Sequence, residues 1–165
     1  MNPSRLSPLS SQEIWREQIN IPLFLLALTG SGGEARISEL VEKIREKHFK
    51  ILVVDDEDGF RKSFCFKLRR KYLAQVDDVN SGSLAIAAVM RGETYDLVFS
   101  DIMMPGLKGT DTFEELQRLD QNLRVILMSA YSDSDEWKRA EELGAELLHK
   151  PIDDDLLIKI LSQSH

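Results

Sequence analysis

Short apolar runs alternate with helical patterns from residue 49 to the end of the printed sequence. Runs of roughly four to eight apolar residues between helical patterns are typical of the parallel strands of an α/β sheet. We assign strands to residues 50–54, 75–79, 96–100, 124–129 and 146–149, and helices to residues 58–72, 82–91, 110–119, 134–143 and 153–162. Right-handed crossovers and a central first strand predict a doubly wound, five-stranded parallel sheet of order 2-1-3-4-5, the flavodoxin-like arrangement.

Polar residues stand where four of these strands end. Asp55 and Asp56 follow the first strand, Asp101 follows the third, Ser129 ends the fourth, and Lys150 follows the fifth. Open α/β sheets bind ligands at the carboxyl ends of their strands. We therefore expect the carboxylates, the hydroxyl and the ammonium to meet at one edge of the sheet.

Three carboxylates at one edge, from Asp55, Asp56 and Asp101, repel one another unless a cation is bound. A few carboxylates with retained waters describe a Mg²⁺ site, whereas Ca²⁺ takes a fuller set of protein oxygens. Taken alone, the aspartates after the first strand read as a solvated loop that caps a helix. The presence of Ser129 and Lys150 at other strand ends favours acceptance of a phosphoryl group by Asp101, because that chemistry depends on positioning and charge neutralisation.

Four segments resemble the receiver domain of two-component response regulators: Ile51–Glu57, Tyr95–Gly106, Met128–Ala130 and Lys150-Pro151. The resemblance covers about residues 49–165. It implies that a sensor histidine kinase or a histidine phosphotransfer protein donates a phosphoryl group and that Mg²⁺ is required. The implied site consists of Asp101 as phosphoacceptor, Asp55, Asp56, Asp101 and the Met103 carbonyl as Mg²⁺ ligands, Ser129 as the switching hydroxyl and Lys150 as the phosphoryl contact. The family also usually has a cis peptide at the position of Lys150-Pro151.

Two departures from the family pattern lie near the last strand. The segment 144–151 is one residue shorter than the usual stretch, and Leu147 replaces the Tyr or Phe that normally rotates inward on activation. These departures leave a phosphorylation-independent protein-binding module as an alternative. Tyr131 reads either as a shield that, with Met103, slows hydrolysis of the acyl phosphate or as an exposed loop aromatic.

The N-terminal part has a different character. Residues 1–10 are rich in Ser and Pro and are expected to be flexible. Residues 11–48 read as a helical extension that ends in an amphipathic helix over 37–47. This extension resembles the opening helices of a helix-turn-helix unit, so a DNA-binding transcriptional regulator is one alternative and a docking or dimerisation element is another. Acidic and basic residues are equal in number before residue 49, so the net charge of −7 belongs to 49–165 and nucleic acid is disfavoured as a partner.

Individual residues argue against a hydrolase and indicate where a partner would bind. Met103 stands where a hydrolase with an Asp nucleophile needs a second acid two residues after Asp101. We therefore expect no enzymatic activity beyond self-phosphorylation and slow autodephosphorylation. Arg61, Lys62 and Ser63, on the first helix of the receiver-like region, are expected at the surface, where the family commonly reads its partner.

The remaining expectations concern compartment and assembly. Cys65 is the only cysteine and is expected to be a small residue on a helix face. No apolar run approaches the roughly 20 residues of a bilayer span, and no signal peptide is recognisable. We expect a cytoplasmic protein without membrane contact that acts on an unknown downstream protein, through a surface or through residues 1–48, with a homodimer as a candidate assembly.

Overall fold

The computed structural model describes residues 38–39, 42, 46 and 48–163. The chain divides into two units, Met1–Glu39 and Leu40–His165, and the fold below is that of the second. Predictions for residues 1–10 and for most of the 11–48 extension lie outside the described residues. The domain boundaries therefore stay predictions.

Five parallel strands and five helices alternate along residues 50–163, within the continuous part of the second unit that the structure describes. They are β1 (Lys50–Val54), α3 (Asp58–Tyr72), β2 (Gln75–Val79), α4 (Gly82–Met90), β3 (Leu97–Asp101), α5 (Gly109–Leu119), β4 (Arg124–Ser129), α6 (Asp135–Glu142), β5 (Glu146–His149) and α7 (Asp154–Gln163). The sheet order is β2-β1-β3-β4-β5, and every neighbouring pair is parallel. The predicted flavodoxin-like fold is confirmed, and the ends of its elements lie within a residue of the predicted ones.

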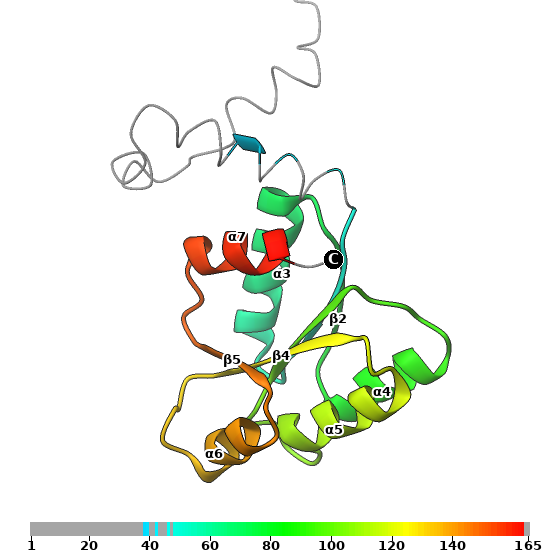
Figure 1. Cartoon of the computed structure of the whole chain (residues 1–165), viewed down its shortest axis with the longest axis vertical. Helices are drawn as coiled ribbons and strands as arrows, with labels where there is room; N and C mark the ends of the chain where they lie inside the picture. The colour runs from blue at the N-terminus through cyan, green and yellow to red at the C-terminus, as the bar shows by residue number, and fades with distance from the viewer. Residues whose placement is uncertain (1–37, 40–41, 43–45, 47, 164–165) are drawn as a thin grey trace, which may run out of the picture. The chain divides into compact units, whose positions relative to one another are not determined.

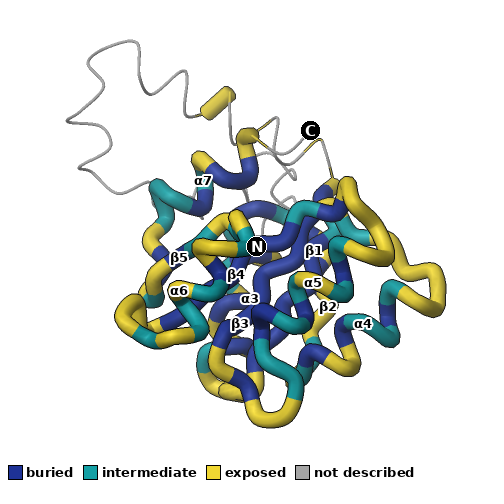
Figure 2. The backbone as a smooth tube through the Cα atoms, turned by 60° about the horizontal axis from the view of Figure 1, so that its bottom comes forward, coloured by how far each residue is buried: buried dark blue, intermediate teal, exposed yellow. Residues whose placement is uncertain are grey.

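Helices cover both faces of the sheet, with α3 and α7 on one face and α4, α5 and α6 on the other (Figure 1). Alternation along the strands explains the two layers, because successive side chains of a strand point to opposite faces. In β1, Ile51 and Val53 join the core under α3 and α7, whereas Leu52 and Val54 join the core under the other three helices. The central strands are buried and the outer helix surfaces are exposed (Figure 2).

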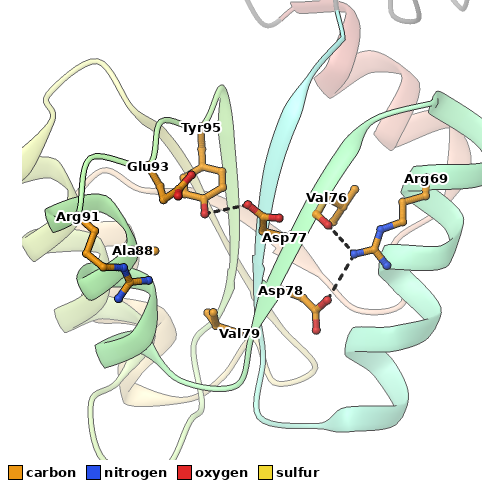
Figure 3. A pocket seen from close by; sticks show the side chains of 9 residues that line it. All are labelled: Arg69, Val76, Asp77, Asp78, Val79, Ala88, Arg91, Glu93 and Tyr95. Atoms are coloured by element: carbon orange, nitrogen blue, oxygen red, sulfur yellow. Dashed lines mark hydrogen bonds and ion pairs between the residues drawn. The ribbon is translucent and has the colours of Figure 1, made fainter.

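The outer strand β2 is the polar edge of the sheet. Asp77 and Asp78 are exposed there, as is common for strands that must not pair with another chain. A hollow of about 410 Å³ lies along this edge, and some of the polar side chains that line it bond to one another (Figure 3). Tyr95 donates a hydrogen bond to Asp77 at 3.1 Å, and Asp78 pairs with Arg61 and Arg69. None of the predicted site residues lines this hollow.

Helix α3 is fastened to the sheet by one apolar face. Phe64, Cys65, Leu68 and Tyr72 are buried on that face at helical spacing. Cys65 is a free thiol, 1% exposed, which confirms its predicted place on a helix face. No helix in the described part of the chain has the length and apolar character that a bilayer crossing needs.

Candidate functional site

Three charged groups meet at the carboxyl edge of the sheet. Strands β1 and β3 are neighbours with Val54 opposite Ser100, so the next residues, Asp55 and Asp101, lie side by side. The Lys150 ammonium arrives from the end of β5, with Nζ 2.6 Å from Oδ1 of Asp101 and 2.7 Å from Oδ2 of Asp55. The topology thus joins residues that are far apart in the sequence.

The backbone fixes the second oxygen of each carboxylate. The amide of Met103 donates to Oδ2 of Asp101 at 2.7 Å, and the amide of Glu57 donates to Oδ1 of Asp55 at 2.9 Å. Each carboxylate is therefore held between an ammonium and a peptide N–H. Asp101 is the last residue of β3, whereas we predicted it to follow the strand, so the strand itself sets its position.

Burial makes the charges of the site interact strongly. Asp55 is 1% exposed and Asp101 is 6% exposed. Burial raises the pKa of Asp101, which outweighs the hydrogen bond and the charge of Lys150; the Asp55 charge raises it further. Burial lowers the pKa of Lys150, but its bonds to Asp101 and Asp55 outweigh this effect and the net direction is upward. One firmly charged ammonium consequently faces two buried carboxylates.

The donor set suits a hard divalent cation held by few protein ligands. The two buried carboxylates exceed the single ammonium in charge, and Asp56 adds an exposed carboxylate to the same loop. Among the described residues no group of three or more His, Cys, Asp or Glu side chains stands ready to hold a metal ion. A cation here would therefore complete its shell with a backbone carbonyl and waters, as Mg²⁺ does. The roles predicted for Asp55, Asp56, Asp101 and the Met103 carbonyl stay predictions.

Comparison with known protein families identifies the family of this chain. The family model of the response regulator receiver domain matches residues 51–162. The chain belongs to the response regulator receiver family.

Relatives of this receiver differ in length. Sporulation initiation phosphotransferase F of Bacillus subtilis is 37% identical over 108 residues, which are 64% of this chain and 85% of that protein. The transcriptional regulatory protein FixJ of Azorhizobium caulinodans is 31% identical over 115 residues, 68% of this chain, and this chain spans 53% of it. The structure of the response regulator TrrA of Thermotoga maritima in complex with Mg²⁺-BeF has a TM-score of 0.60 and 30% identity, covering 68% of this chain and 96% of that one.

Ser129 sits at the buried end of β4 in this receiver. Its Oγ accepts a hydrogen bond from the Tyr131 amide at 2.9 Å and donates to the Tyr131 carbonyl at 3.2 Å, so the hydroxyl is engaged with the loop backbone. The Ser129 carbonyl accepts from the Lys150 amide at 2.8 Å, which ties the two predicted site residues together. The Tyr131 side chain is 65% exposed and that of Met103 40% exposed, and their shielding role stays a prediction.

The departures before Lys150 are accommodated without disturbing the sheet. Leu147 is half-buried against the core under α4, α5 and α6. The aromatic contact of this region comes instead from Trp137 of α6 and His149 of β5, whose ring centroids are 6.5 Å apart. The peptide Lys150-Pro151 is cis, as the family resemblance implied.

The predicted surface role of Arg61 is wrong, because this residue is 7% exposed. Its Nη1 donates to the backbone carbonyl of Asp55 at 2.7 Å and its Nε to Oδ2 of Asp78 at 3.1 Å, so it fastens the acidic loop to β2. Lys62 and Ser63 are exposed as predicted. The signal for Arg61 was its helical spacing from the buried Phe64 and Leu68, which places it on the inward face of α3.

Two further residues of the edge were not singled out from the sequence. Gly109 starts α5 directly against β3, and its amide donates to the Ile102 carbonyl at 2.9 Å. Phe60 presents its ring to the ammonium of Lys150. Only the folded chain brings these pairs together, although a glycine in the first turn of a helical pattern is a signal of close approach.

Proposed function

We propose that this receiver accepts a phosphoryl group on Asp101 and acts as a phosphorylation-controlled switch. The observation that carries the proposal is the Asp101 carboxylate, buried at a strand end and held by both the Lys150 ammonium and the Met103 amide. A carboxylate oxygen held in this way is oriented for attack on phosphorus. The negative charge that develops on the transferred phosphoryl group then meets a cation that is already in place, the Lys150 ammonium. The donor in this proposal is the phosphohistidine of a sensor histidine kinase or of a histidine phosphotransfer protein.

The transfer breaks one bond and forms one. A carboxylate oxygen of Asp101 forms a bond to phosphorus while the N–P bond of the phosphohistidine breaks, and the leaving imidazole takes a proton from solvent. Lys150 exchanges its bond to Asp101 for one to a phosphoryl oxygen, and the Ser129 hydroxyl leaves the Tyr131 backbone to hold another. Mg²⁺, held by Asp55, Asp56, Asp101 and the Met103 carbonyl, would supply charge neutralisation at the phosphoryl oxygens.

The relatives support this proposal by their chemistry. TrrA, at 30% identity, was solved with Mg²⁺-BeF, which supports a Mg²⁺-dependent phosphoryl site here. The similarity to Sporulation initiation phosphotransferase F, of which this chain spans 85%, supports a second role in which Asp101 passes the phosphoryl group on to another protein. Apart from self-phosphorylation and slow autodephosphorylation we propose no enzymatic activity. The proposed setting is the cytoplasm, where sensor kinases present their phosphohistidines.

Intact-mass spectrometry after incubation with acetyl phosphate and Mg²⁺ tests the proposal. We expect one phosphoryl adduct on the natural chain, none on Asp101→Asn and none when Mg²⁺ is removed. Asp120→Asn, which changes an exposed carboxylate at the end of α5, is the matched control and should behave like the natural chain. A natural chain that forms no adduct and hydrolyses no donor would favour the phosphorylation-independent binding module.

A further inference from the structure

The Lys150 ammonium has a third neighbour besides the two carboxylates. Its Nζ lies 4.1 Å from the centroid of the Phe60 ring. An ammonium has three N–H donors, and Asp55 and Asp101 take two of them. The aromatic face therefore covers the remaining side of the charge, which is the arrangement of a cation–π contact.

The Phe60 ring is the first of three aromatic rings that pack in series toward β3, the strand that ends in Asp101. It stacks on Phe64, one turn later in α3, at 5.5 Å and 21°. Phe64 in turn meets Phe99 edge-on at 5.2 Å and 83°. Phe99 lies in β3, two residues before Asp101. The ring that touches Lys150 thus packs against the same core as β3, the strand that carries Asp101.

We propose that Phe60 is a positioning residue for Lys150, and this role rests on the proposed function. Phosphorylation of Asp101 turns the partner of the ammonium from a carboxylate oxygen into a phosphoryl oxygen, so the ammonium must shift. A hydrogen bond holds one direction, whereas attraction to a ring face tolerates small displacements. The ring keeps the long Lys150 side chain over the acidic edge during the exchange, when one of its two hydrogen bonds is absent.

The contact can be measured without any phosphoryl chemistry. Protons above an aromatic face are shifted upfield, so the Lys150 ε-CH₂ signal should be upfield in the natural chain and should return to its ordinary position in Phe60→Leu. Phe60→Tyr keeps the ring face and should keep the shift. Phe64→Leu removes a neighbouring ring that has no contact with the ammonium and should also keep it. An ordinary shift in the natural chain would overturn the proposal.

The positioning role is tested by the rate of phosphorylation by acetyl phosphate with saturating Mg²⁺. We expect Phe60→Leu to be slower by about tenfold, and Phe60→Tyr to stay within about twofold of the natural chain. Phe64→Leu is the matched control, because it changes the same core but keeps an apolar side chain next to Phe60 and leaves the Phe60 ring itself present, so its rate should stay within about twofold.

Two results would overturn the role even when the upfield shift is found. One is equal slowing of Phe60→Leu and Phe64→Leu, which would show that the ring acts through core packing alone. The other is a failure of Phe60→Tyr to restore the rate. A natural chain that accepts no phosphoryl group would overturn the proposed function, and the role with it, while the upfield shift would still report the contact.

Discussion

Gly109, the first residue of α5, packs against the backbone of Asp101. A Cβ atom at Gly109 would lie 2.2 Å from the Asp101 carbonyl oxygen and 2.7 Å from Cα of Ile102. The neighbours are backbone atoms of a central strand, which cannot move aside as the end of a flexible side chain can. The start of α5 can therefore lie this close to the end of β3 only because residue 109 has no Cβ atom.

Gly109→Ala should consequently destabilise the fold by about 1–3 kcal/mol, the usual cost of overpacking a closed site. Urea unfolding of the two proteins measures this difference. Gly59→Ala is the matched control, because Gly59 also lies in the first turn of a helix but has nothing within 4 Å of its Cβ position. That variant should be neutral or more stable, by up to about 1 kcal/mol. Equal effects of the two substitutions would argue against close packing at Gly109.

Arg61 should behave as a structural residue of the acidic loop. Its removal leaves the Asp55 carbonyl without its guanidinium partner and the Asp78 carboxylate with Arg69 alone, so Arg61→Ala should cost about 3 kcal/mol of unfolding free energy. Arg61→Lys should restore little, because a single ammonium cannot make both bonds. The exposed Arg70 on the same helix gives the control, and Arg70→Ala should change stability by less than about 0.5 kcal/mol. A tolerated Arg61→Ala in thermal unfolding would contradict the assignment.

The ionised Asp101 carboxylate should cost stability in the absence of metal. Burial raises the pKa of this carboxyl above its ordinary value of 3.8, so the folded chain binds the proton more tightly than the unfolded chain. Stability contributed by this group therefore falls as pH rises from about its ordinary pKa through the raised one, and stays reduced at neutral pH. Asp101→Asn should thus raise the unfolding free energy by about 1 kcal/mol near neutral pH in EDTA.

The pH dependence of stability distinguishes removal of the Asp101 charge from a general effect of placing an asparagine side chain at this position. The gain of Asp101→Asn should shrink as pH falls and should vanish below about pH 4, where the natural carboxyl is increasingly protonated in both states. Asp56→Asn changes an exposed carboxylate of the same edge and should shift stability by less than about 0.5 kcal/mol. A gain for Asp101→Asn that is independent of pH would refute the electrostatic explanation.

Cys65 should be nearly inert toward thiol reagents in the folded chain. The side chain is buried, and burial raises the pKa of its thiol to about 11, so the reactive thiolate is scarce near neutral pH. We expect labelling by a chromogenic disulfide at about pH 8 to be slow in buffer and fast in denaturant. Rapid labelling without denaturant would show that the face of α3 opens readily.

The strands and helices were predictable because one simple rule fixes them. Buried parallel strands must be continuously apolar, and the helices between them must carry an apolar stripe, so the boundaries between runs mark the elements. The apolar runs 51–54 in β1 and 97–99 in β3 satisfy this rule. The order of the strands followed from the handedness of crossovers. The N-terminal extension has no comparable rule, and its predictions are untested.

The meeting of Asp55, Asp101 and Lys150 was also predictable, because parallel strands end at one edge. The inward direction of Arg61 and the ring contact of Phe60 were not, since each depends on a partner from another element. A charged residue on a helix is ordinarily solvated, and an aromatic on a helix ordinarily packs in a core. Only the fold shows that both contact groups at the strand ends, Arg61 the Asp55 carbonyl and Phe60 the Lys150 ammonium.

The central claim is that Asp101 is the residue that carries the phosphoryl group. Treating the acetyl phosphate-reacted chain with borohydride reduces an acyl phosphate to the alcohol, which converts the modified aspartate to homoserine and marks its position permanently. Peptide mapping by mass spectrometry then locates the mark. The account predicts homoserine at position 101 alone, and only in samples reacted with Mg²⁺. Homoserine at another aspartate, or none in a chain that carries the adduct, would contradict it.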